Sequence, residues 1–496
     1  MKLYLFIPSY AFLVLTLAAL SFLGGCSTNP ATGSQSFTAF MSPEDEARVG
    51  AEEHPKIVRE LGGAYKAIPL DAYVRKIGTK LASVSEMPNV PWHFTVLNDP
   101  QVNAFALPGG YVYITRGLLA LAENEAEMAS VLAHEIGHVT ARHAAQRYST
   151  TMATQIGLTG LGILGSVFGM PNGLGRIVST GAQVALQQYS QSQELEADML
   201  SVRYLIRAGY DPNAMTSFFW KLKLHSELAA REQGKDGVSH NIMSTHPRTK
   251  DRISQAIEVS KIKNLKNPIV RRNEYLKRID GMVFGDDPTQ GIRKGREFLH
   301  PELRIAFTVP PKFILFNSPR QVVAFGPKKS RIVFDVTNQK EAKKIDNLAH
   351  YIHSVWGRRL GITTTEKLNI NGMEAAMGIA KVGKGSNARD VRLVVARASS
   401  KHIFRMAFIL TPSEAHRLNL ALRRTTYSLR RLSPAEAGAI RPLRLKVQKV
   451  QTGDSIAKLA RRLPLERFKR EWFRLLNSLS IGQKLIRGHS VKMVVE

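Results

Sequence analysis

The segment His134-Glu135-Ile136-Gly137-His138 restricts the fold of this chain more than any other five residues. Residues four apart share one face of an α-helix, so the two histidines can bind one metal ion together if the segment is helical. Acidic residues followed by a largely apolar stretch over residues 123–133 favour that helix. Glu135 would then lie beside the metal, where a carboxylate can take a proton from a bound water. The pattern therefore predicts a zinc-binding helix, although such a match by itself also arises by chance.

A second acidic segment supplies a candidate for the third ligand. A hydrolytic zinc needs three protein ligands and one open position for water. Glu194 begins the segment Glu194-Leu195-Glu196-Ala197-Asp198, 56 residues after His138, and would complete a two-histidine, one-glutamate set from another predicted helix. Asp198 lies one turn further and could accept a hydrogen bond from the free N–H of a ligand histidine. The alternative for any acidic helix is a solvated face, and we assign Glu196 to such a face.

Four stretches resemble, in matching order, the gluzincin-type zinc metallopeptidases related to HtpX and the CAAX prenyl protease, and specifically their soluble periplasmic lipoprotein branch. The stretches lie within residues 42–260 and are 103–119, 134–138, 194–198 and 244–247. The resemblance implies that His134, His138 and Glu194 bind zinc and that Glu135 is the general base. It also implies an edge strand on which extended substrate binds by β-augmentation. The residues that match this strand are Asn103, Ala104, Phe105, Ala106 and Leu107.

Two further histidines lie in or near these stretches. His143 follows His134 by nine residues, one fewer than in a third-histidine ligand pattern, so we do not assign it to the metal. His246, in Ser244-Thr245-His246-Pro247, is isolated in the sequence, and an isolated histidine is usually structural or exposed. The resemblance instead places it at the active site. There His246 could stabilise the oxyanion or cap the zinc in a resting state.

The only cysteine of the chain, Cys26, follows a segment with the features of an export signal. Lys2, a mostly apolar run over residues 3–23 and two glycines precede it, which is typical of a secretory signal peptide rather than a membrane span. Leu23-Gly24-Gly25-Cys26 resembles the lipobox of bacterial lipoproteins, in which the cysteine is acylated and becomes the mature N-terminus. The alternative is an uncleaved membrane anchor. We expect a signal peptide over 1–25 and a periplasmic protein held on the outer membrane by lipid on Cys26, because Ser27 rather than Asp follows.

Hydropathy patterns divide the rest of the chain into four parts. Residues 26–41 are small and polar and are predicted to be a tether. Over residues 42–260 the pattern is mainly helical, and the resemblance implies that they form an α+β, mainly helical, zincin-type metallopeptidase domain with a small edge-strand sheet. Strand-like alternation predicts an α+β accessory domain over 280–435, and a small LysM-like unit is expected over 441–496. An apolar, glycine-rich stretch over 156–184 favours a hairpin or lid beside the active site, with a buried helical pair as the alternative.

Basic residues are concentrated in the second half of the chain. Residues 1–260 contain 21 Lys+Arg and 22 Asp+Glu, whereas the remaining 48 Lys+Arg and 18 Asp+Glu lie in 261–496. Nucleic acid is the usual partner of so basic a region, but an exported lipoprotein rarely meets it. Lipopolysaccharide phosphates or cell-wall polymers are the available anionic partners. Residues 450–460 and 475–485 resemble parts of a LysM module, which makes peptidoglycan a candidate; a solvated basic surface without a ligand is the alternative.

The metal-binding pattern predicts a zinc metalloendopeptidase that hydrolyses peptide bonds. The resemblance implies that its substrates are envelope proteins, in periplasmic quality control or outer-membrane assembly. Its expected partners are envelope protein substrates and, through the basic half, lipopolysaccharide or peptidoglycan, but not nucleic acid. One alternative is a chaperone or assembly factor with a latent protease site. Another is a lipoprotein that binds envelope polymers and carries a vestigial site. The intact Glu135 argues against a vestigial site.

Overall fold

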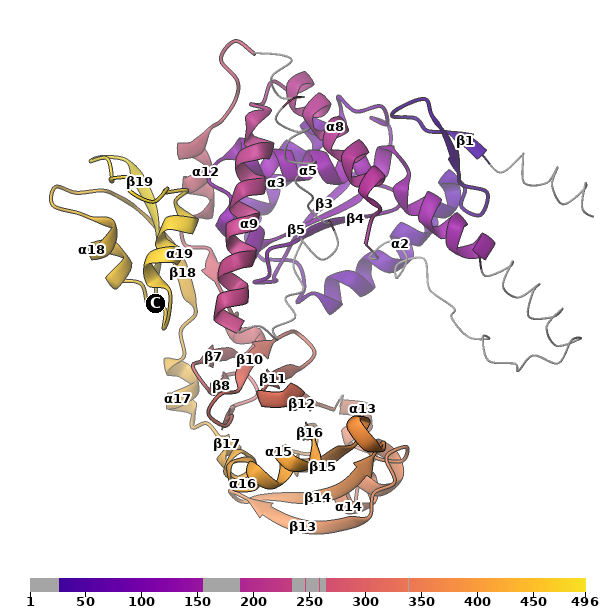
Figure 1. The fold of residues 1–496 in the computed structure, drawn as a ribbon, viewed down its shortest axis with the longest axis vertical. Coiled ribbons are helices and arrows are strands. Elements are labelled where there is room, and N and C mark those ends of the chain that lie inside the picture. Colours follow the sequence, from indigo (N-terminus) through magenta and orange to yellow (C-terminus); the bar gives the residue numbers. More distant parts are fainter. Residues whose placement is uncertain (1–25, 155–187, 234–245, 247–257, 259–264, 338) are drawn as a thin grey trace, which may run out of the picture.

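The computed structural model describes residues 26–154, 188–233, 246, 258, 265–337 and 339–496. Figure 1 shows a helical body around a small sheet, a second body built mainly of strands, and a C-terminal unit beside α9 (Asn213–Gln233) and α12 (Arg272–Ile279). The α+β class predicted from the sequence is confirmed. The predicted signal peptide and the hairpin over 156–184 lie outside the described residues. Within the described part of the chain, no helix combines the length and apolar character needed to cross a membrane.

The helical body holds a three-stranded sheet with the order β3-β5-β4. β3 (His93–Leu97) runs parallel to β5 (Tyr111–Thr115), and β4 (Ala104–Leu107) runs antiparallel to β5 with Ala104 opposite Ile114. Among the strands that the structure describes, β4 lies at the edge of this sheet. The same body contains the helices α2 (Pro43–Glu60), α3 (Ile68–Ala82), α4 (Arg116–Leu121), α5 (Glu125–Thr140) and α8 (Gln191–Arg207).

Side-chain caps set the starts of these helices. Ser42 begins α2 with a capping box and Pro43 occupies its first turn, where the missing N–H of proline costs no hydrogen bond. Asn124 accepts a hydrogen bond from the backbone N–H of Glu127 at the start of α5. Ser190 caps α8 in the same way. The two helices that carry the predicted metal ligands therefore begin at locally encoded positions.

α5 is buried along almost its whole length. Every residue from its start to His138 is buried, so its polar side chains need partners inside the protein. Glu125 accepts a hydrogen bond from Tyr73 of α3 at 2.5 Å, and Glu127 pairs with Lys221 of α9 at 2.7 Å. These buried contacts join α5 to its neighbours and fix its position in the body.

The segment predicted to be a tether is packed on the helical body instead. β1 (Cys26–Thr28) and β2 (Gln35–Phe37) form an antiparallel hairpin, and Asn29 between them is only 2% exposed. Arg203 of α8 donates a hydrogen bond to a backbone carbonyl of the hairpin at 2.9 Å. The small polar residues indicated a free linker, but their backbone and amide groups find partners on neighbouring helices. The tether expected over 26–41 is therefore corrected to an ordered hairpin and its connection to α2.

The second body has three layers. Its elements are β7 (Ile292–Lys294), β8 (Glu297–His300), β9 (Ile305–Thr308), β10 (Ile314–Asn317), β11 (Val322–Phe325), β12 (Arg331–Val336), α13 (Gln339–Ala342), α14 (Leu348–His350), the π-helix η3 (Tyr351–Trp356), β13 (Thr364–Ile370), β14 (Met373–Val382), β15 (Arg389–Arg397), β16 (Ile403–Leu410), α15 (Pro412–Arg417), α16 (Asn419–Ser428) and β17 (Arg430–Arg431). The middle layer is an antiparallel sheet with the order β10-β11-β12-β16-β15-β14-β13. One face packs on the sheet β17-β9-β8-β7 and α16, and the other on α13, α14 and η3. Alternation along β15 produces this arrangement, since Val394 lies in the first interface and Val395 in the second.

The C-terminal unit shares its hydrophobic core with the helical body. It consists of β18 (Leu443–Lys449), α18 (Ile456–Arg461), α19 (Lys469–Leu476) and β19 (Ser490–Val495), and α17 (Pro434–Ala439) precedes it. β18 pairs with β19 and with β6 (Val283–Phe284), which lies in the range expected for the accessory domain. One buried cluster contains Leu132 of α5 together with Phe473 and Val494 of the unit. The unit therefore packs as part of the helical body, and its LysM-like character stays a prediction.

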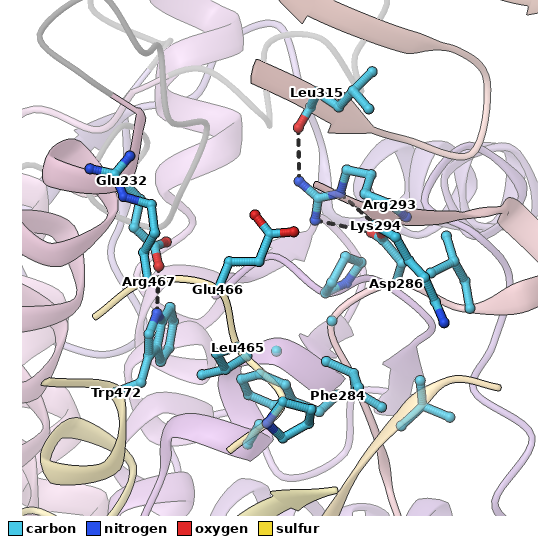
Figure 2. A pocket seen from close by; sticks show the side chains of 18 of the residues that line it. Glu232, Phe284, Asp286, Arg293, Lys294, Leu315, Leu465, Glu466, Arg467 and Trp472 are labelled. Carbon is cyan, nitrogen blue, oxygen red and sulfur yellow. Dashed lines mark hydrogen bonds and ion pairs between the residues drawn. The ribbon is translucent and has the colours of Figure 1, made fainter. Parts of the chain in front are cut away.

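A cavity of about 680 Å³ lies where the two bodies and the C-terminal unit meet. Figure 2 shows Trp472 of α19 donating to Glu232 of α9 at 2.6 Å, and Arg293 of β7 paired with Asp286 at 2.7 Å. The carboxylate of Glu466 points into the space between these pairs. The described residues that line the cavity include none of the predicted metal ligands, so it is separate from the site described next.

Candidate metal centre

The predicted site residues converge from separate parts of the helical body. α5 carries His134, Glu135 and His138, and α8 carries Glu194. His246, far from both helices in sequence, lies against them. Ligand atoms of His134, His138, Glu194 and His246 all lie within 4.8 Å of one another, and the four residues are buried. The tertiary fold therefore brings together every residue that the sequence assigned to the metal, and His246 with them.

The spacing of the ligand atoms fits one metal ion. Nε2 of His138 lies 3.0 Å from Nε2 of His134 and 3.4 Å from Oε1 of Glu194. Nε2 of His134 lies 3.6 Å from Oε2 of Glu194. A tetrahedral ion with bonds of about 2.0–2.1 Å separates its ligand atoms by about 3.3 Å. The cluster could therefore hold a small divalent metal with two imidazoles and a carboxylate as ligands.

His246 directs Nδ1 at the ligand atoms. Nδ1 of His246 lies 2.8 Å from Oε1 of Glu194 and 3.4 Å from Nε2 of His134. Its Nε2 lies 3.7 Å from Oε1 of Glu135, which is fully buried. Of the two roles considered for His246, this orientation favours a fourth ligand position over contact with a substrate oxyanion, because the ring faces the ligand set itself.

Asp198 lies where the sequence predicted. Its Oδ1 is 2.9 Å from Nδ1 of His134. The carboxylate can therefore hold the His134 ring in an orientation in which Nε2 faces the other ligands. Both side chains are buried. The close approach of α5 and α8 makes this contact possible: a Cβ atom at Gly137 would lie 3.1 Å from the carbonyl oxygen of Ala197.

Sequence reasoning missed the partner of the other ligand histidine. Nδ1 of His138 lies 2.8 Å from Nδ1 of His143, and Nε2 of His143 lies 3.1 Å from Oε2 of Glu196. The assignment of Glu196 to a solvated face is therefore wrong: 22% of its side chain is exposed, and both carboxylate oxygens have partners. His143 follows the motif closely, but its spacing matched no ligand pattern, so the sequence carried no specific signal for this contact.

An aromatic ring covers one side of the cluster. The ring of Tyr189 stacks on His138 with centroids 3.7 Å apart, and the guanidinium of Arg147 lies 3.6 Å from the centroid of the same tyrosine ring. Burial raises the pKa of Tyr189 to about 12, so the phenol stays neutral at physiological pH. Tyr189 excludes water from His138, and it precedes α8 outside every motif that the sequence analysis used.

Burial and hydrogen bonds shift the pKa values of the site residues in different directions. Burial holds the pKa of His138 well below its ordinary value, which keeps the ring neutral and able to bind a metal. Burial also opposes a charge on His134, but its bonds to Asp198 and Glu194 outweigh burial and raise its pKa to about 9. Burial disfavours the charged form of Glu194 as well, yet the facing histidines, His246 above all, hold its pKa far below its usual range. A metal ion would take the place of these protons.

The predicted substrate strand lies next to the metal helix. β4 packs against α5, and all four of its residues are buried. Asn103, at its start, is held to the neighbouring strand by its backbone N–H, which donates to Oγ1 of Thr115 at 3.1 Å. Within the described residues, β4 pairs with β5 on one side only.

Known proteins are similar to part of this chain. The chain is 34% identical over 230 residues to the Beta-barrel assembly-enhancing protease of Yersinia pestis, an alignment that covers 44% of this chain and 45% of that protein. The protein of the same name from Escherichia coli (strain K12) is 34% identical over 208 residues, covering 40% and 41% of the two chains. The Mitochondrial metalloendopeptidase OMA1 of Schizosaccharomyces pombe is 28% identical over 224 residues, covering 44% and 62%. The alignments with the two bacterial relatives thus span less than half of their length.

A protein-family model matches a defined part of the chain. Residues 70–260 match peptidase family M48, and they include His134, His138, Glu194 and His246. Among solved structures, cyanobacterial PsbP from Synechocystis resembles 30% of this chain, and 98% of its own, with a TM-score of 0.22 and 12% identity. The match of residues 70–260 to peptidase family M48 agrees with the metallopeptidase resemblance found in the sequence.

Proposed function

We propose that this chain is a zinc-dependent endopeptidase. The observation that supports it most is the buried convergence of His134, His138 and Glu194, with Glu135 on the same helix as the two histidines. Two imidazoles and one carboxylate form a ligand set of catalytic zinc sites, which keep a further position for water. The match to a peptidase family over this region agrees with that chemistry.

The residues of the site divide the work of amide hydrolysis. His134, His138 and Glu194 would hold the zinc ion, which when bound supplies a Lewis acid for water and for the scissile carbonyl. Glu135 takes the proton from the attacking water and delivers it to the leaving amine. Asp198 keeps the ring of His134 in one orientation through the bond to Nδ1. Burial of Glu135 keeps its carboxylate away from bulk water.

β4 would bind the substrate. An edge strand offers unpaired backbone N–H and C=O groups, so an extended peptide can add to the sheet beside α5. Residues 103–107, the match to the family's substrate strand, include all of β4. Backbone pairing of this kind recognises extended chains with little dependence on sequence, which suits unfolded or unassembled proteins as substrates.

His246 would cap the metal in a resting state. Its Nδ1 faces the ligand atoms from a direction that water must also use, so the site is closed to substrate while the ring stays there. This observation favours, as a second candidate function, a chaperone or assembly factor whose protease site is normally latent. The two functions differ in whether cleavage accompanies binding.

We place this activity in the bacterial envelope. Two bacterial relatives carry the name Beta-barrel assembly-enhancing protease, and envelope proteins under quality control or outer-membrane assembly are the corresponding substrates here. Cys26 is exposed at the start of β1, where an acyl chain could reach a membrane. The proposed location is the periplasm, with lipid on Cys26 as the anchor to the outer membrane.

The experiment compares the mature protein with its Glu135→Gln variant in an envelope extract. The mature protein should contain one zinc per chain and generate fragments; Glu135→Gln should keep the zinc and generate none, because it loses the base and no ligand. His134→Ala should lose both. Glu52→Gln, which changes an exposed glutamate of α2, is the matched control and should cleave normally.

The same extract separates the two candidate functions. Equal capture of envelope proteins by the mature protein and Glu135→Gln, with fragments from neither, would support the chaperone. Cleavage by Glu135→Gln at the rate of the mature protein would show that another group is the base, and the proposed mechanism would be wrong.

A further inference from the structure

Each ligand histidine has a second ring nitrogen that faces away from the other ligands. On His134 this nitrogen lies 2.9 Å from Oδ1 of Asp198. On His138 it lies 2.8 Å from Nδ1 of His143. The two rings are therefore held by different partners, a carboxylate for one and a second imidazole for the other.

The contacts of His143 determine which nitrogen of each histidine ring donates a hydrogen bond. Nε2 of His138 faces the ligand atoms, so the ring hydrogen is on Nδ1 and donates to Nδ1 of His143. His143 then carries its hydrogen on Nε2, which donates to Oε2 of Glu196 at 3.1 Å. The side-chain amide of Asn29 donates to Oε1 of the same carboxylate at 3.0 Å. These hydrogen bonds form a series that runs from His138 through His143 to Glu196, which Asn29 also contacts. Every donor in the series has an acceptor, as expected of groups that orient a metal ligand.

A strained turn places His143 next to His138. Arg142, which follows the C-cap residue of α5, has a φ of 56°, a left-handed conformation that non-glycine residues rarely adopt. Its guanidinium donates to Oε2 of Glu46 at 2.9 Å and to the carbonyl of Met41 at 2.8 Å. These buried bonds hold the turn, which directs the chain back so that the ring of His143 meets that of His138.

The N-terminal hairpin (residues 26–38) completes the series. Asn29 is 2% exposed, and its own conformation is fixed because the backbone N–H of Ala31 donates to its Oδ1 at 2.9 Å. The N–H of Gly33 donates to the carbonyl of Asn29 at 2.8 Å. The residue that contacts Glu196 is therefore part of an ordered turn three positions after Cys26.

We propose that His143 and Glu196 are positioning residues for the metal ligand His138, and that Asn29 makes the N-terminal hairpin part of the support of the metal site. This inference rests on the proposed metal-binding function of His138. An imidazole whose second nitrogen is hydrogen-bonded keeps its lone pair directed at the metal and is a more basic ligand. The hairpin thereby contributes to metal affinity, because Asn29 contacts Glu196 at the end of the series that lies farthest from His138.

Zinc affinity of the mature protein tests the central residue. We expect His143→Leu to weaken zinc binding by about 10–100-fold, measured by competition with a chelator, and to shift the visible spectrum of the cobalt-substituted protein. His143→Asn offers a carbonyl oxygen near the position of Nδ1, so it should recover most of the affinity. His225→Leu, which alters a histidine on α9 outside the metal cluster, is the matched control and should leave both readouts unchanged.

The outer members of the series are tested in the same assay. Glu196→Gln keeps an acceptor for His143 but removes its charge, so it should lose less affinity than His143→Leu. Asn29→Asp brings a second carboxylate against Glu196 and should weaken zinc binding more than Asn29→Ala. Glu196→Gln and Asn29→Asp keep side-chain size, so they test the series even if His143→Leu does not fold.

The outcomes separate this inference from the proposed function. If His143→Leu and Asn29→Asp bind zinc as tightly as the unaltered protein while His134→Ala does not, the positioning series is overturned and the metal site stands. If His143→Asn loses as much affinity as His143→Leu, His143 acts by packing alone and the inference is also wrong. Retention of zinc by His134→Ala would instead overturn the proposed metal site.

Discussion

Gly137, between the two ligand histidines, controls how closely α5 approaches α8. A Cβ atom there would lie 3.1 Å from the carbonyl oxygen of Ala197 and 3.3 Å from Cβ of Leu200. The position of Glu194 relative to the histidines depends on this separation, because Glu194 and Ala197 lie on the same helix. A single hydrogen-sized side chain thus sets the width of the metal cluster.

We expect a size series at this position to change metal binding. Gly137→Ala should have nearly the same free energy of unfolding as the parent. The gain of about 1 kcal/mol in helix propensity offsets the cost of moving α8 by a few tenths of an ångström. Gly137→Leu should cost about 1–3 kcal/mol of unfolding free energy by overpacking and should lower the zinc content, because α8 must move away. Urea denaturation and metal analysis measure the two effects. A Gly137→Leu protein with full zinc would show that the helix spacing does not set the site.

His246→Ala distinguishes the two roles considered for that residue. The cap predicts that zinc is retained by three ligands and that peptide cleavage becomes faster, since Nδ1 of His246 lies among the ligand atoms. A role at the oxyanion predicts instead a fall in kcat of about 10²–10³ with zinc retained. We expect faster cleavage, measured with a quenched peptide at matched zinc content. A fall of that size would assign His246 to transition-state stabilisation.

At the scale of elements, β19 reaches the end of α4 through one buried lysine. Lys492 is 0% exposed, and its Nζ donates to the carbonyls of Ala120 at 3.0 Å and Ala122 at 2.7 Å. It also lies 3.3 Å from Oε2 of Glu123. The last carbonyls of a helix lack partners within it, so this cation satisfies the end of the helix that precedes α5.

Lys492→Met should destabilise the whole helical body. The variant keeps the apolar length of the side chain and leaves the α4 carbonyls without a donor, which should lower the free energy of unfolding by about 1–3 kcal/mol. Lys446→Met, an exposed lysine of β18, is the matched control and should change stability little. Thermal melting followed by circular dichroism reports both. Equal melting temperatures for the two variants would contradict a supporting role for β19.

The contact between α9 and α19 should be sensitive to acid. Burial lowers the pKa of His225 to about 4, and its ring meets Trp472 of α19 edge to face at 5.8 Å. Because the folded pKa lies below the unfolded value of about 6.5, the unfolded state gains a proton first as pH falls, and stability from this residue decreases between about pH 6.5 and 4. The melting temperature of His225→Gln should therefore fall less than that of the parent between pH 6.5 and pH 4. Parallel loss in both proteins would show that His225 does not titrate on unfolding.

At the scale of the whole molecule, the C-terminal unit and the helical body pack as one unit. Most of the basic charge lies beyond residue 260. The cluster that contains Leu132 also contains Phe473 and Val494, so removing the C-terminal unit would expose the core of the peptidase body. Binding by the basic half is therefore best measured on the intact mature chain. Lipopolysaccharide or cell-wall polymer is the partner that the charge of the sequence leads us to expect.

The intact protein should bind lipopolysaccharide in a salt-dependent way. Exposed charges are screened over about 10 Å at 0.1 M salt, so binding should weaken steeply between low and physiological salt. Glutamine substitutions at four exposed basic residues of the second body should weaken it further: Lys343, Lys344, Arg358 and Arg359. The charge-matched control carries glutamines on exposed positions of the peptidase body: Arg48, Arg59, Lys66 and Lys76. Binding that resists salt would instead indicate a specific glycan site of the LysM type.

Features with a local cause could be predicted from the sequence of this protein. The i, i+4 spacing of His134 and His138 predicted the metal-binding face of α5, and the start of α2 likewise has a local cause in Ser42 and Pro43. The alternation of buried Phe94 and Val96 with less buried neighbours along β3 is a signal of the same local kind. Helical turns, caps and strand alternation depend on residues a few positions apart, so these signals are present in the chain before it folds.

Tertiary structure alone decided the contacts between distant segments. Glu196 reads as a solvated position on an acidic helix, yet it pairs with His143 and Asn29, which lie 53 and 167 residues away in the chain. The hairpin after Cys26 reads as a tether, and Lys492 reads as one of many surface lysines, but both are packed against the helical body. Whether a polar side chain is solvated or buried depends on which distant groups fill its hydrogen bonds, and that choice is made only when the chain packs.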